Sequence, residues 1–159
     1  MENSFEPKAN IVLSSLGDFL GIPDLQFDEE DNTCRFQFNE ELVIHLTFNE
    51  EKQELMIHSL VGQLPEEDRA KMVEQLMEAN LFWAGTRGAT MSLDRESSQV
   101  IIANTLSPYD ANGSLLSGES LAKTMVDLAE MNLHWGTFLK KGPESSVVEP
   151  VSLDANRFL

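Results

Sequence analysis

The order of apolar and polar positions along the chain predicts an alternation of helices and strands. Between Lys8 and Leu20, apolar residues recur at the spacing of one helical face. Gly21 and Pro23 then end the predicted helix. The apolar face of this helix comprises Ile11, Val12, Leu16, Phe19 and Leu20, and Leu13 lies off it.

Strict alternation of apolar and polar residues follows in three stretches. It predicts strands at 34–38, 42–48 and 55–61, which are joined by short polar turns. Such turns between alternating strands are typical of an antiparallel meander. Further on, 89–93 and 100–106 predict a hairpin. Because 100–106 is almost entirely apolar, we expect a central strand that is covered on both faces.

Two more helices complete the pattern. One is predicted to start at Pro65, with acidic residues in its first turn, and to run to about Leu81. The other is predicted from Ser117 to Lys141, and Gly142 follows it. The order helix, three strands, helix, two strands, helix predicts an α+β fold. We expect one five-stranded, mostly antiparallel, twisted sheet with three helices.

The length of 159 residues fits a single domain. We place this domain at 1–142. The remaining residues, 143–159, are polar and contain two prolines, so we predict a flexible C-terminal tail.

The excess of acidic residues limits the kinds of molecule that the chain can bind. The chain has 27 Asp and Glu residues against 11 Lys and Arg, which gives a formal charge of −16. Such a surface repels nucleic acid and anionic membranes, which we therefore exclude as partners. A basic partner or a need for solubility would explain the sign. The single cysteine, Cys34, and an N-terminus without a signal pattern favour the cytosol.

The sequence gives little support for a catalytic or metal-binding site. His45 and His58 lie on neighbouring predicted strands, on the less apolar face, and His134 lies far away, so we predict surface histidines and no metal site. Cys34 beside Arg35 is better explained as a small buried residue than as a nucleophile. The adjacent carboxylates lie in turns, and the glycines form no phosphate-binding loop. We therefore expect no enzyme activity and no cofactor.

Adjacent aromatic residues follow the second predicted helix. Phe82 and Trp83 point in different directions, so one of them is expected to leave the core of the domain. Exposed apolar surface marks binding sites, and a second copy of the chain could bury this one. The alternative is that these residues simply fill the core.

Local sequence here resembles a known family. The segment 78–84, Glu-Ala-Asn-Leu-Phe-Trp-Ala, is followed by a glycine break and by Met91-Ser-Leu-Asp. These residues resemble the centre of the class I chaperones of bacterial type III secretion, the Tir-chaperone-like family. The predicted element order and the acidic composition are also similar, and the resemblance extends from about Ile11 to Leu139.

The resemblance implies a homodimer in the bacterial cytoplasm that uses no ATP. Family members bind a segment near the N-terminus of a secreted effector in extended form and keep it competent for secretion. Docking on the export ATPase is a further possibility within the family. The carried-over effector-binding residues are Val12, Leu13, Leu16, Phe36 and Phe38. The carried-over dimer residues are Met72, Leu76, Leu81, Trp83, Met91 and Leu93.

Two other functions stay open. One is a non-catalytic adaptor or regulatory domain of related α+β fold, which would bind an intact folded partner. The other is a hydrolase or metal enzyme, which would need a stoichiometric metal, Cys34 or a histidine.

Overall fold

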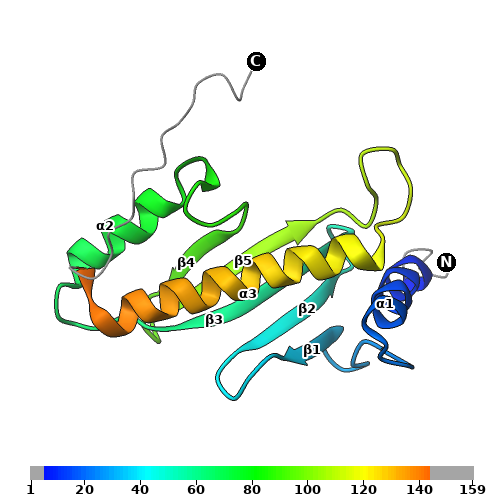
Figure 1. Ribbon diagram of the computed structural model, residues 1–159, viewed down its shortest axis with the longest axis horizontal. Helices are drawn as coiled ribbons and strands as arrows, with labels where there is room; N and C mark the ends of the chain where they lie inside the picture. Colours follow the sequence, from blue (N-terminus) through cyan, green and yellow to red (C-terminus); the bar gives the residue numbers. More distant parts are fainter. Residues whose placement is uncertain (1–5, 144–159) are drawn as a thin grey trace.

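The computed structural model describes residues 6–143, and the predicted order of helices and strands is confirmed (Figure 1). A short 3-10 helix, η1, is added after the second helix. The elements are α1 (Glu6–Leu20), β1 (Thr33–Gln37), β2 (Val43–Asn49), β3 (Glu54–Gln63), α2 (Arg69–Ala79), η1 (Leu81–Trp83), β4 (Thr90–Asp94), β5 (Gln99–Leu106) and α3 (Gly118–Lys141).

The five strands form one antiparallel sheet in the order β1-β2-β3-β5-β4. The first three strands make the expected meander, and β4 and β5 make the expected hairpin. β3 is therefore the middle strand, and β1 and β4 are the edges. Edge strands present unpaired backbone donors and acceptors, to which another strand can add.

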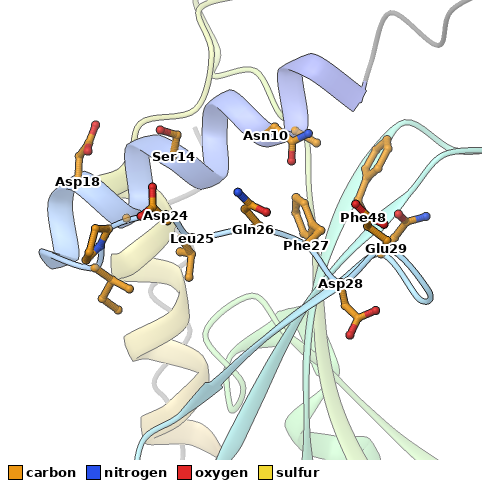
Figure 2. Close-up of a pocket in the computed structure, with 15 residues that line it drawn as sticks. Asn10, Ser14, Asp18, Asp24, Leu25, Gln26, Phe27, Asp28, Glu29 and Phe48 are labelled. Atoms are coloured by element: carbon orange, nitrogen blue, oxygen red, sulfur yellow. The ribbon is translucent and has the colours of Figure 1, made fainter.

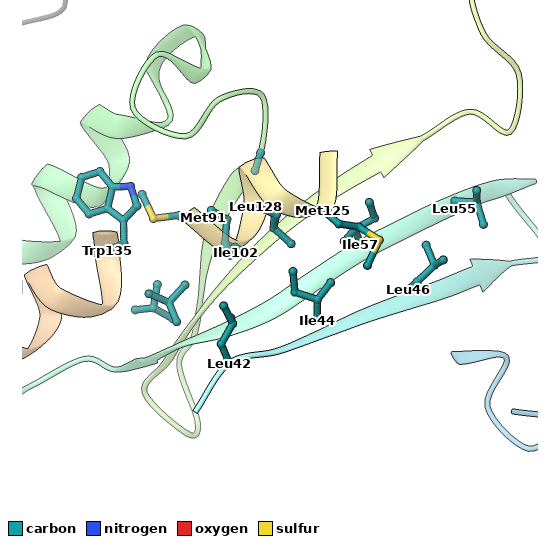
Figure 3. Packing of buried hydrophobic residues seen from close by; sticks show 14 of the residues in the cluster. Leu42, Ile44, Leu46, Leu55, Ile57, Met91, Ile102, Met125, Leu128 and Trp135 are labelled. Carbon is teal, nitrogen blue, oxygen red and sulfur yellow. The ribbon is translucent and has the colours of Figure 1, made fainter. Parts of the chain in front are cut away.

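The long helix α3 packs on one face of the sheet along β3 (Figure 1). Apolar side chains fill the space between helix and sheet (Figure 3). Alternation along each strand supplies the inner side chains, because successive residues point to opposite faces. The labelled inner residues of the sheet include Ile44, Leu46, Ile57 and Ile102, which are all fully buried.

A polar link fixes α3 to the sheet. The Asn132 side chain is buried and donates to Ser59 Oγ at 3.0 Å and to the Leu60 carbonyl at 2.8 Å. Ser59 Oγ in turn donates to the Val43 carbonyl of β2 at 2.7 Å. Buried polar groups must be hydrogen-bonded, so this network fixes where α3 sits on β3.

Helix α1 packs against the first turns of α3. The Gly118 amide donates to Ser15 Oγ at 2.9 Å, and a Cβ added to Gly118 would lie 2.1 Å from the Ser15 carbonyl oxygen. Only glycine allows the two backbones to approach this closely. The contact sets the rotation of α1 and hence which of its faces is buried.

The structure corrects two sequence predictions. Helix α2 begins at Arg69 and not at Pro65, because Asp68 adopts a left-handed conformation with φ of 54°. Strand β5 is interior but is covered on one face only. Val100 and Ile102 are buried, whereas Ile101 and Ala103 are half-buried on the opposite face, as expected for an antiparallel sheet with helices on one side.

Candidate interaction surfaces

Exposed apolar side chains gather where α2 ends. Met77 is 68% exposed, and Leu81, Phe82 and Trp83 are 56%, 66% and 55% exposed. Leu93 on β4 is 37% exposed and lines a small depression together with Met77. We call this set of five residues the α2–η1 surface. Large exposed apolar side chains gathered in one region mark a candidate contact site.

The two aromatic residues of this surface lie on a strained backbone. Phe82 and Trp83 have positive φ angles of 51° and 55°. A left-handed conformation costs a non-glycine residue on the order of 1 kcal/mol or more, and it persists only where the surroundings enforce it. The aromatic side chains are therefore held outward at a cost to the folded monomer.

Hydrogen bonds from three elements enforce this turn. The Asn80 side chain accepts from the Met91 amide at 2.8 Å and donates to the Met91 carbonyl at 3.0 Å, as a neighbouring strand would. Trp83 Nε1 donates to Thr90 Oγ1 at 3.3 Å. Trp135 Nε1 on α3 donates to the Gly85 carbonyl at 3.0 Å. The exposed aromatics are thus presented by a rigid segment and not by a loose loop.

The carried-over dimer residues divide into two groups. Met72, Leu76 and Met91 are buried within the chain itself, so in this conformation they can only support a contact from beneath. Leu81, Trp83 and Leu93 are exposed. The sequence reasoning expected one of Phe82 and Trp83 to leave the core, and both do. The exposure of Met77, which lies off the buried stripe of α2, was not predicted.

The effector-binding residues carried over onto helix α1 lie in the core of the domain. The carried-over effector-binding residues Val12, Leu13 and Leu16 have at most 1% of their surface exposed, so they offer no surface to a client in this conformation. Their stripe, which begins at Ala9, packs into the core at the spacing i, i+3, i+4, i+7. The exposed apolar residues of α1 are instead Ile11, Phe19 and Leu20.

A groove of about 630 Å³ runs along the other side of α1. Figure 2 shows α1 on one side of it and the segment 22–29 on the other. The helix contributes Asn10, Ser14 and Asp18, and the segment contributes Leu25 and Phe27 with several carboxylates. The segment is held close at Gly17, whose carbonyl accepts from the Ile22 amide at 2.9 Å.

The edge strand β1 follows this segment directly. Its Phe36 is half-buried, and Phe38 just beyond it is 46% exposed. No described strand pairs with the outer edge of β1. An extended peptide could add to this edge through its backbone and place alternate side chains against the apolar ones.

The groups considered for catalysis or metal binding are a buried thiol and two stacked imidazole rings. Cys34 is buried, and burial raises the pKa of its thiol, which keeps it protonated and unreactive. The rings of His45 and His58 stack on each other, with centroids 4.9 Å apart. Residues 6–143 hold no cluster of three or more metal-binding side chains, and no helix among them could span a bilayer.

Comparisons with known proteins agree with the fold. A model of the Tir chaperone protein (CesT) family matches residues 12–132. The chain is similar to a chain of the ExsC–ExsE complex, with 22% identity, a TM-score of 0.66, and coverage of 89% of this chain and 98% of that one. No curated protein matches the chain by sequence.

Two further solved structures share the fold. The HopA1–SchA chaperone–effector complex contains a similar chain at 18% identity and a TM-score of 0.66, covering 86% of this chain and 97% of that one. The ExoU–SpcU complex from the type III secretion system of Pseudomonas aeruginosa contains another, at 14% identity and a TM-score of 0.61, covering 82% and 99%.

Proposed function

The chain belongs to the Tir chaperone protein family and is a non-catalytic type III secretion chaperone, and from this premise we propose how it holds its client. It binds a segment near the N-terminus of one or more secreted effectors in extended form, in the bacterial cytoplasm. Binding keeps the effector stable and competent for secretion without ATP. Residues 1–142 form the chaperone domain and 143–159 are a flexible tail; residues 1–5 and 144–159 lie outside the described residues.

The observation that carries this proposal is the groove beside α1, which opens next to an edge strand. The partly buried apolar Leu25 and Phe27 in the groove suit alternate side chains of an extended client. Asp18 and Asp24 line the same groove, so basic residues of the client would be favoured. The client site therefore moves from the buried face of α1 to this groove, with β1 and Phe38 continuing it.

We further propose that the chaperone is a homodimer that buries the α2–η1 surface. In a symmetric dimer the same residues of both copies form the contact. The exposed aromatic residues flank a turn that the bonds of Asn80 to Met91 hold in place, which would favour such a contact. The acidic exterior keeps such a dimer soluble. Docking of the complex on the export ATPase is a separate hypothesis, which co-sedimentation of the loaded chaperone with the purified ATPase would test.

The test is affinity capture of clients from the native bacterial lysate, followed by limited proteolysis of the bound proteins. We expect a protected effector segment of tens of residues. Ser14→Arg places a bulky cation in the groove and should reduce capture. Ser114→Arg, which adds the same charge to the exposed loop after β5, is the matched control.

The alternative function predicts a different result. An adaptor would retain an intact folded partner, and proteolysis would leave no short protected segment. In that case Ser14→Arg would capture the partner as well as Ser114→Arg does. Equal capture by the two arginine variants, with a protected segment in both, would keep the chaperone function but remove the groove as its client site.

A further inference from the structure

One row of residues crosses the sheet on the face opposite α3. Strand register aligns Arg35 of β1, His45 of β2, His58 of β3 and Ala103 of β5. The two imidazole rings in the middle of this row are nearly parallel, with an interplanar angle of 14°. Directly opposite residues in adjacent strands are the closest pairs in a sheet, so the two rings share one environment.

The surroundings of both rings disfavour the protonated form. His58 Nδ1 is buried and has no hydrogen-bond partner among the described residues. Burial lowers the pKa of His58, and the neighbouring His45 lowers it further. Burial also lowers the pKa of His45, and the Arg35 cation adds to this effect, whereas Asp31 opposes it. Asp31 itself is paired with Arg35.

We propose that the stacked His45–His58 pair is an acid-responsive element, which loosens the contact between β2 and β3 when one ring gains a proton. A charged His45 ring would face Arg35 on one side and the His58 imidazole on the other, whereas a charged His58 ring would face His45 and Ala103. Further along the row, Ala103 and then Thr90 are uncharged. The neighbours on the same two strands, Val43, Thr47, Met56 and Leu60, are also uncharged.

The histidine pair lies next to the hydrogen bonds that connect β2 and β3 to α3, so a change at the pair can affect the rest of the domain. Ser59 follows His58 directly, points to the opposite face, and bonds to the Val43 carbonyl two residues before His45. Asn132 of α3 bonds to the same hydroxyl. Separation of β2 from β3 at the histidines therefore strains the polar link that fixes α3 on the sheet.

The direction of the pH effect follows from the lowered pKa values. Both histidines have a lower pKa in the folded chain than the value of about 6.5 expected when unfolded. The unfolded chain therefore binds protons first as the pH falls. The stability that the neutral pair contributes is complete above about pH 6.5 and is lost as the pH falls from there through the lowered values.

Urea unfolding at about pH 7.5 and at about pH 5 tests the proposal. The variants are the double substitution His45→Gln with His58→Gln, and the control His134→Gln at the exposed histidine of α3. We expect the wild type and the control to lose unfolding free energy on acidification, and the double variant to lose clearly less. An equal loss in all three would overturn the proposal.

A second measurement does not depend on the fold of the double variant. Proton NMR of the wild-type imidazole rings should give two coupled titration steps for the pair, both below the ordinary histidine value of about 6.5. Titration of the pair at or above that value would refute the switch. Both experiments use the chain without a client, so their outcome is separate from that of the client-capture test.

Discussion

The α1 end and the α2–η1 end of the molecule present apolar residues in different ways. At the α1 end, Leu13 and Leu16 are buried, and the neighbouring groove combines a few apolar side chains with polar and acidic ones. At the α2–η1 end, Phe82 and Trp83 stand outside the core on a left-handed turn. The first surface suits an extended segment of mixed character, and the second suits an apolar contact.

The difference shows that exposure was decided by backbone geometry and not by local composition. Both ends carry enough apolar residues to fill a core. At α1, the contact between Gly118 and Ser15 turns one stripe inward. At η1, the bonds of Asn80 to Met91 hold the turn so that the aromatics point outward. Three substitution pairs test this comparison, from the largest expected effect to the smallest.

The largest effect is expected from Leu13→Ala. This fully buried leucine fills space in the core, so its truncation should lower the free energy of unfolding by about 2–5 kcal/mol. Leu81→Ala removes the same atoms from an exposed position and should change the monomer by about 0.5 kcal/mol or less. Urea unfolding in dilute solution measures both. A similar cost for the two leucines would mean that Leu81 is buried in the protein as it exists in solution.

Trp83→Asp should have the next largest effect, on association. A carboxylate in an apolar contact between two copies is costly, and we expect dimerisation to weaken by about 2 kcal/mol or more. Sedimentation equilibrium measures this. Phe19→Asp is the matched control, because Phe19 on α1 is 55% exposed, as is Trp83. If both aspartate variants dissociate, or neither does, the α2–η1 surface is not the specific dimer contact.

Asn80→Ala should have the smallest effect of the three. It leaves the Met91 amide and carbonyl without their partner at the edge of the sheet, which should cost about 1–3 kcal/mol. Amide hydrogen exchange should accelerate in the 80–91 segment. Asn112→Ala in the exposed loop after β5 should change neither quantity. Unchanged exchange in the Asn80 variant would show that other contacts are sufficient to hold the turn.

Much of the fold could be predicted because its signals are local. Alternation identified four of the five strands, and a continuous apolar run identified the fifth. The helical spacing predicted α3, whose Leu121, Met125 and Trp135 are buried in the core. The start of α2 was wrong, because a proline and three acids before a helix resemble a first turn even where Asp68 breaks the helical geometry. The pattern of 100–106 was also misleading, since an apolar strand can leave one face half-covered.

The candidate site was less predictable than the fold. The aromatic pair after α2 could be found as a signal, but whether one or both residues were exposed depended on φ angles that no side-chain pattern encodes. The groove beside α1 has no sequence signature, because its apolar, polar and acidic lining residues come from separate segments and none of them is unusual by itself. The stacking of the histidines required the register of β2 on β3.

The sequence by itself determined the order of the elements, the acidic exterior and the resemblance to secretion chaperones, because these depend on residue type and on spacing within one element. Only the tertiary structure decided which stripe of α1 is buried, where a client could lie and which aromatics are free for a partner. The physical reason is that burial is set by contacts between distant segments. Gly118 against Ser15 and Asn80 against Met91 are such contacts, and each selects among faces that the local pattern leaves equivalent.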